Sequence, residues 1–317
     1  METATLRRPP PLPGLVQLGL IFGLVAFAAL SWAVTDDRMG GMDAGPGTAL
    51  GDLGWFLGVW AVMMAAMMFP SIAPMVLMFA RIQEGRRERG QDAPSGATAL
   101  FVGGYLVAWS VAGLIGYAIV EGVRDLDPSV LAWDEAGPYV AGGVIVAAAI
   151  YQLTPLKDVC LRHCRSPLFF LLHHSHPGRI GALRMGIEHG GFCVGCCWML
   201  MAALFALGVM SLGWMAFIAA LIATEKLLPW KALANRGIAV VLLVLGLGVA
   251  IAPGDIPGLV EPGSPEAMRA METMGMEGDE AGMSEDESMG GMSGEGEMSD
   301  EGAAGMGGEG MGGEEMP

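Results

Sequence analysis

The chain has 317 residues, of which 53% are hydrophobic, and its mean hydropathy is +0.51, yet its formal net charge is −16. The negative charge is concentrated in one segment, because residues 261–317 hold sixteen Asp and Glu and a single basic residue, Arg269. The rest of the chain is almost neutral and strongly apolar. These features exclude a single water-soluble globular domain. The acidic balance also disfavours nucleic-acid binding, which depends on basic patches.

Seven apolar runs approach or exceed the length needed to cross about 30 Å of hydrocarbon. They lie at residues 14–34, 53–80, 98–120, 138–154, 187–209, 211–228 and 237–252. The fourth and the seventh are short for a span, so we expect six or seven spans. Arg7 and Arg8 precede the first run, but no small-residue cleavage site follows it, so we expect an uncleaved helix. The sequence therefore predicts an all-α, polytopic membrane helix bundle.

Basic residues indicate the orientation of this bundle, because cytoplasmic loops carry an excess of Lys and Arg. With seven spans and a cytoplasmic amino terminus, only Arg38, Arg124 and Arg269 of the seventeen basic residues fall outside. The predicted organisation is a cytoplasmic amino terminus at 1–13, a transmembrane domain at 14–252 and an external tail at 253–317. A Cys/His-rich cytoplasmic loop is expected at 155–186. This is the topology of a multi-pass cell-membrane protein, whose first partner is the lipid bilayer.

The external tail is acidic and rich in Met and Gly. Residues 261–317 contain eleven Met and no aromatic residue. Such a segment cannot bury a core, so we expect it to be disordered. Its thioethers and carboxylates would suit the collection of metal ions, and the alternative is a solubilising acidic tail.

The fifth apolar run carries a stripe of imidazole and thiol groups. Residues His189, Cys193, Cys196 and Cys197 are spaced i, i+4, i+7 and i+8 and share one face of a helix. Groups of this kind are costly in a bilayer and usually face the protein interior. Imidazole and thiolate together suit copper, zinc or iron–sulfur chemistry. The alternative is that the thiols are inert small residues of a close helix contact.

The second apolar run has methionines at helical spacing, namely Met64, Met68 and Met75, with Met63 and Met67 beside them. Methionine is an ordinary core filler, and that interpretation would be preferred for this run alone. Beside a thiol cluster, thioether ligands become credible because thioether and thiolate both select Cu(I). We therefore expect the second and fifth spans to pack together, with the glycines at 190, 191 and 195 allowing close approach.

The predicted loop at 155–186 adds a second group of donors, Cys160, His163 and Cys164. These residues could bind zinc or copper or take part in a redox relay. The alternative is a basic face for anionic lipid headgroups, formed by Arg162, Arg165 and Arg179. All five cysteines are cytoplasmic or in the inner part of the membrane by this topology, so a structural disulfide is not expected.

Three motifs resemble a known family. They are Met-Met-Ala-Ala-Met-Met-Phe-Pro-Ser at 63–71, Lys-Asp-Val-Cys-Leu-Arg-His-Cys-Arg-Ser-Pro at 157–167 and Gly-Phe-Cys-Val-Gly-Cys-Cys-Trp-Met-Leu-Met at 191–201. Together they resemble the predicted metal-binding integral membrane proteins, a domain of unknown function sometimes labelled copper chaperone. The resemblance covers roughly residues 50–250 and not the tail. Ser211 stands where the family pattern leads us to expect Asn. The resemblance implies a helical membrane fold and metal binding.

Two classes of function fit these features. In the first, the protein holds copper(I), or alternatively zinc, and passes it to or receives it from a partner protein. The expected ligands are Cys193 with Cys196 or Cys197, together with His189 and one of Met64 or Met68. In the second, it is a membrane thiol–disulfide oxidoreductase or a metal-bearing subunit of an enzyme complex, for which a Cys-x-x-Cys spacing is suitable. No phosphate-binding loop or Ser/His/Asp constellation is recognisable, so the sequence favours a binding protein over an enzyme.

Overall fold

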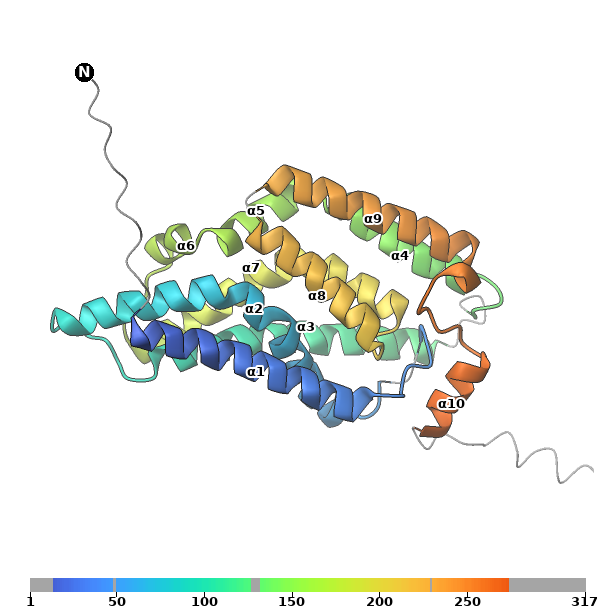
Figure 1. The fold of residues 1–317 in the computed structure, drawn as a ribbon, viewed down its shortest axis with the longest axis horizontal. Helices are drawn as coiled ribbons and strands as arrows, with labels where there is room; N and C mark the ends of the chain where they lie inside the picture. Colours follow the sequence, from blue (N-terminus) through green and yellow to red (C-terminus); the bar gives the residue numbers. More distant parts are fainter. Residues whose placement is uncertain (1–13, 48–49, 127–131, 229, 274–317) are drawn as a thin grey trace, which may run out of the picture. The chain divides into compact units, whose positions relative to one another are not determined.

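The computed structural model describes residues 14–47, 50–126, 132–228 and 230–273, and all regular structure in this part is helical (Figure 1). The helices are α1 (Leu15–Met39), α2 (Leu53–Glu88), α3 (Ala97–Asp125), α4 (Gly137–Tyr151), α5 (Pro155–Arg165), α6 (Pro167–His173), α7 (Gly178–Leu207), α8 (Leu212–Leu227), α9 (Lys231–Ile251) and α10 (Pro265–Thr273). A short 3-10 turn lies at Pro253–Asp255. The predicted all-α class is confirmed.

Each of the seven apolar runs forms a helix, and several of these helices can cross a membrane. Five are long and apolar enough, namely α1, α2, α3, α7 and α9. A sixth span is possible if α4 and α5 are counted together, although the pair is bent by 68°. The prediction that the seventh run is short does not hold, because α9 begins at Lys231 and has 21 residues. The fourth run is short as predicted, since α4 has 15 residues, and the sixth is short as well, since α8 has 16.

Helix α7 lies at the centre of the arrangement and packs mainly against α3, α4 and α5, whereas α2 packs against α1, α3 and α8. The second and fifth spans, which the sequence predicted to pack together, are α2 and α7, and they share the neighbours α3 and α8. A ring stack between Trp60 of α2 and Phe205 of α7, with centroids 5.8 Å apart, joins the two helices directly. The Met and Cys stripes belong to one continuous buried core.

Glycines allow α3 and α7 to approach closely. A Cβ atom at Gly186 of α7 would overlap the carbonyl oxygen of Phe101, and one at Gly104 of α3 would overlap that of Leu183. A Cβ atom at Gly190 would lie 2.6 Å from the Cβ of Ala108. Backbone approach of this kind is typical of membrane helix pairs. The role predicted for Gly190 is thus seen against α3, and Gly191 has nothing within 4 Å.

The two ends of the bundle differ in charge, as the sequence predicted. At one end Arg81 donates to Gln17 over 2.7 Å and Arg86 donates to Ser175 over 3.0 Å, so the basic end of α2 meets the start of α1 and the segment before α7. At the opposite end Ala44 packs with Ala267 and Ala270 of α10. Arg38 and Arg124 lie in the last turns of α1 and α3, and Arg269 lies in α10. Which end faces the cytoplasm stays a prediction.

Two segments differ in the structure from what the sequence predicted. The segment 155–186 is not a loop, because it contains α5, α6 and the first two turns of α7. Thr154 caps α5 by accepting from the backbone N–H of Lys157, and Pro155 occupies the first helical position. Residues 253–273, assigned to the tail, include a 3-10 turn and α10. The predictions for 1–13 and 274–317 lie outside the described residues.

The glycine contact between α3 and α7 can be tested with two substitutions in one helix. Gly186→Ala should lower the free energy of unfolding by about 1–3 kcal/mol, because the new methyl group must displace the α3 backbone. Gly191→Ala is the matched control, since it adds the same methyl group in open space. Thermal unfolding in detergent measures both. Equal stabilities of the two variants would contradict the close packing of α3 on α7.

Candidate metal centre

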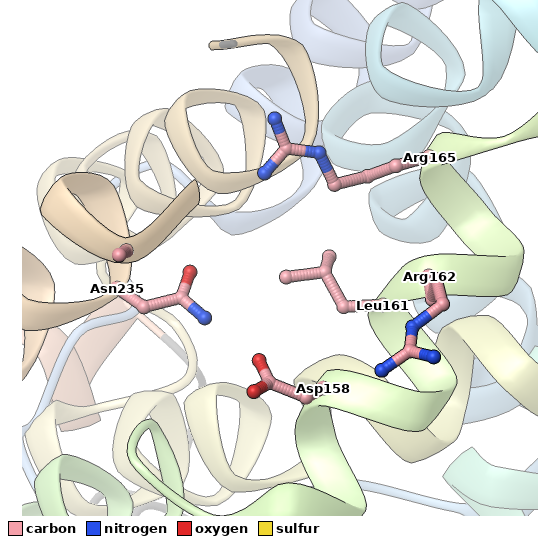
Figure 2. Close-up of a pocket in the computed structure, with 6 residues that line it drawn as sticks. Asp158, Leu161, Arg162, Arg165 and Asn235 are labelled. Atoms are coloured by element: carbon pink, nitrogen blue, oxygen red, sulfur yellow. The ribbon is translucent and has the colours of Figure 1, made fainter. Parts of the chain in front are cut away.

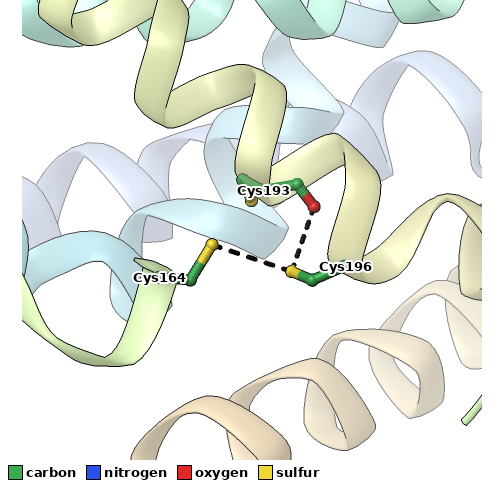
Figure 3. A group of neighbouring side chains, drawn as sticks. All are labelled: Cys164, Cys193 and Cys196. Atoms are coloured by element: carbon green, nitrogen blue, oxygen red, sulfur yellow. Dashed lines mark hydrogen bonds between the residues drawn. The ribbon is translucent and has the colours of Figure 1, made fainter. Parts of the chain in front are cut away.

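Three cysteine sulfurs from two helices form a compact cluster. The Sγ atoms of Cys164, Cys193 and Cys196 all lie within 4.8 Å of one another, and those of Cys164 and Cys196 are 3.8 Å apart (Figure 3). Cys193 and Cys196 are fully buried, and Cys164 is half-buried. The structure therefore brings together two motifs that the sequence presented as separate sites. Three sulfurs at such separations can converge on one soft metal ion.

Helix α7 sets the direction of its three thiols. Cys196 donates from Sγ to the carbonyl oxygen of Cys193 over 3.1 Å, and Cys197 donates to the same oxygen over 2.9 Å. Both side chains thus point back over the preceding turn, as is usual in a helix. Cys197 is fully buried but is not a member of the three-sulfur cluster. Of the two alternatives predicted as the partner of Cys193, the structure places Cys196 in the cluster.

Helix α5 reaches α7 at a glycine. A Cβ atom at Gly195 would lie 2.8 Å from the Sγ atom of Cys160, so only glycine leaves room for this contact. The hydroxyl of Tyr151 donates to the carbonyl oxygen of Gly195 over 2.5 Å and ties the end of α4 to the same turn of α7. Cys160 therefore packs α5 against α7 at Gly195. Cys164, one turn later on α5, lies in the sulfur cluster. The close approach predicted at Gly195 is made by α5.

The predicted histidines lie beside the sulfurs and are held by aromatic rings. His189 is 1% exposed and stacks with Phe101 at a centroid distance of 5.9 Å, and its Nδ1 has no partner among the described residues. It lies one turn before Cys193 and is not part of the three-sulfur cluster. His163 stacks on Phe192 at 4.1 Å, and its Nδ1 is 2.9 Å from the carbonyl oxygen of Val159. The role of His189 and of His163 as metal ligands stays a prediction.

The predicted methionines are all core residues. Met63, Met64, Met67, Met68 and Met75 are each at most 2% exposed. Helix α2 runs through Pro70 and Pro74 as one α-helix, and the hydroxyl of Ser71 donates to the carbonyl oxygen of Met68 over 2.8 Å. Their burial fits both the core-filler and the ligand interpretation, so a thioether ligand stays a prediction.

A buried ammonium group contacts the cluster. Lys226 donates from Nζ to the Sγ atom of Cys193 over 3.0 Å, and the hydroxyl of Tyr105 lies 3.1 Å from the same sulfur. Lys226 is only 8% exposed. A buried ammonium is costly unless a negative charge compensates it. A thiolate at Cys193 would supply that charge and could also bind a metal cation.

The neighbouring Glu225 has a different partner. Lys157 of α5 donates to Oε2 of Glu225 over 2.7 Å, and both side chains are fully buried. Lys226, which follows Glu225 in the chain, contacts the Cys193 sulfur and not this carboxylate. Tyr105, Lys157 and Lys226 were not among the predicted site residues. The adjacent Glu225 and Lys226 at the end of an apolar run were the available signal, because ionisable groups in spans usually have a function.

Fold and site together define a helical bundle, with several helices able to cross a membrane, that encloses a thiol cluster at the contact of α5 and α7. Residues 57–249, well over half of the chain, match the family described as PpoB2: Copper chaperone. The chain belongs to this family. The match includes all five cysteines, α5 and α7, and excludes α1 and the acidic tail. No curated protein and no solved structure matches the chain.

The buried ion pair beside the cluster can be tested by removing one or both charges. Glu225→Leu should lower the free energy of unfolding by about 3–5 kcal/mol, because the Lys157 ammonium is left buried without a counter-charge. The double variant Lys157→Met with Glu225→Leu should lose much less. Unfolding curves in detergent of the parent, the single variant and the double variant measure these free energies. A double variant as unstable as the single one would show that the pair does not act as a charge pair.

Proposed function

We propose that this protein binds one Cu(I) ion between Cys164, Cys193 and Cys196 and exchanges it with a partner. The single observation that carries the proposal is the convergence of three sulfurs from α5 and α7, two of them fully buried, within 4.8 Å. The family description points in the same direction. The bundle supplies a site from which water is largely excluded, so a bound soft ion is shielded from competing oxygen ligands.

Charge and donor type favour copper(I) over zinc. Thiolates select Cu(I), and three sulfur donors suffice for it. Structural zinc sites are almost always four-coordinate, with Cys and His ligands. Three thiolates and one Cu(I) carry a net charge of −2, which the ammonium of Lys226, 3.0 Å from Cys193, reduces to −1. Lys226 therefore halves the negative charge of the loaded site inside the bundle.

The accessibility of the three sulfurs suggests a path for the ion. Cys164 is half-buried on α5, at the basic end of the bundle, whereas Cys193 and Cys196 lie deeper on α7. A partner thiol could contact Cys164 and receive the ion from the inner pair through it by ligand exchange. With the basic end facing the cytoplasm, as its Lys and Arg predict, this exchange takes place on the cytoplasmic side of the cell membrane. The Met-rich tail would collect ions outside, and His189 with the α2 methionines would receive them within the bundle.

A thiol–disulfide oxidoreductase is the second candidate, and one observation favours it. The Sγ atoms of Cys164 and Cys196 are 3.8 Å apart, so a small movement of α5 would allow a disulfide bond. Forming it removes two protons and two electrons, which an external disulfide or quinone would have to accept. The same residues thus serve either function, and the metal competes with oxidation for them.

A matched pair of serine variants tests the copper site. Cys164→Ser should lower the affinity for Cu(I) by about 100-fold or more, because it removes one of three ligands. Cys160→Ser should leave the affinity unchanged, because Cys160 contacts Gly195 and is not a member of the cluster. Competition with a Cu(I) chelator measures both affinities in the full chain. A second set truncated after Met276 separates the bundle from the Met-rich tail.

The possible outcomes distinguish the candidate functions. Equal affinities of Cys164→Ser and the parent would refute the three-sulfur site, and loss of copper on truncation alone would assign binding to the tail. If the parent takes up no copper but forms a Cys164–Cys196 disulfide with a redox buffer, and reduces it reversibly, the oxidoreductase function is supported in its place.

A further inference from the structure

A polar cavity lies on the opposite side of α5 from the proposed metal site. It has a volume of about 200 Å³ and is lined by Asp158, Leu161, Arg162 and Arg165 of α5 and by Ala232 and Asn235 of α9 (Figure 2). This is smaller than the ~300–1,000 Å³ of pockets for drug-sized ligands. Neither the family description nor the proposed copper function accounts for it.

Two groups at this cavity lack partners among the described residues. They are the Oδ1 atom of Asn235, on a side chain only 6% exposed, and the Nη1 atom of Arg165. The other terminal nitrogen of Arg165, Nη2, donates to the carbonyl oxygen of Leu228, which holds the guanidinium in place. Buried polar groups are normally hydrogen-bonded. Both atoms are themselves buried beside the cavity, so a ligand would bond to them after a small shift of the lining side chains.

The charges at the cavity have both signs. Arg162 and Arg165 are cationic and Asp158 is anionic, and Figure 2 shows Asn235, Asp158 and Arg165 arranged around the open space. A ligand with a single negative charge would gain from the arginines and be repelled by Asp158. A ligand that carries a phosphate and an ammonium group would satisfy all of these groups. Arginine is well suited to phosphate, because its guanidinium can donate two parallel hydrogen bonds.

The surroundings of the cavity indicate a membrane surface. Trp230, which precedes α9, is 66% exposed, and Trp is enriched at the membrane–water interface. Leu233 on α9 is 68% exposed and Leu156 on α5 is 62% exposed. These apolar side chains would face acyl chains next to a headgroup in the cavity. Basic pockets between membrane helices are known to hold lipid headgroups.

We propose that this cavity binds the headgroup of a phospholipid that has a phosphate and a primary amine, as phosphatidylethanolamine does. Arg165 and Arg162 hold the phosphate, and Asp158 and the Oδ1 atom of Asn235 accept hydrogen bonds from the ammonium. The proposal is independent of the copper function. A bound headgroup would clamp α5 to α9, and α5 also carries Cys164.

Binding of three lipids with identical acyl chains tests the proposal on the full chain in detergent, with dissociation constants from native mass spectrometry. Phosphatidylethanolamine should bind at least about fivefold more tightly than phosphatidylcholine, whose quaternary ammonium cannot donate a hydrogen bond. It should also bind more tightly than phosphatidylglycerol, which lacks the amine. Phosphatidylglycerol as the tightest ligand would make the cavity an anion site and overturn the proposal.

Variants of exposed side chains locate the binding. Asp158→Asn should abolish the preference for phosphatidylethanolamine over phosphatidylcholine, and Arg162→Gln should weaken both lipids several-fold. Arg179→Gln is the matched control, because Arg179 is exposed at the start of α7 and does not line the cavity. An unchanged preference in Asp158→Asn, or the same loss in Arg179→Gln, would refute the site. Free phosphoethanolamine that displaces the lipid at equal concentration would show that the ligand is soluble.

Discussion

The contact between the Lys226 ammonium and the Cys193 sulfur, at 3.0 Å, is the interaction on which the account of the site depends. A cation in the interior of a bundle must be compensated by a negative charge. Glu225 is the nearest carboxylate in the sequence, but the buried Lys157 already occupies it over 2.7 Å. Lys226 therefore contacts the sulfur cluster instead of Glu225. Its positive charge partly offsets the negative charge of a copper–thiolate centre.

The same constraint explains why α5 lies where it does. Lys157, near the start of α5, pairs with Glu225 of α8. Cys160, in the middle of α5, packs against Gly195 of α7. These two contacts fix the helix so that Cys164 reaches Cys196. A short polar helix thereby completes a site whose other ligands lie on a long apolar one. Because α5 also forms one wall of the polar cavity, it joins the proposed metal site to the proposed lipid site.

The sequence predicted the helices better than the site. Hydropathy located all seven apolar helices, because the length of hydrocarbon to be crossed is a strong constraint. It also located the thiol stripe of α7, since His189, Cys193, Cys196 and Cys197 all proved buried. It missed α5, a short helix of low apolar content whose place depends on Gly195 and Lys157. The periodicity of the sequence does not reveal that Cys164 lies beside Cys193 and Cys196, or that Lys226 contacts the Cys193 sulfur, because these are tertiary contacts.

The most direct test of the account is X-ray absorption at the copper edge, on the full chain loaded with one equivalent of Cu(I). The account predicts a first shell of three sulfur atoms without nitrogen or oxygen, and a shell of two sulfurs plus one light atom in Cys164→Ser. A first shell that contains a histidine nitrogen in the parent would contradict it. So would a parent spectrum that does not change when Cys164 is replaced.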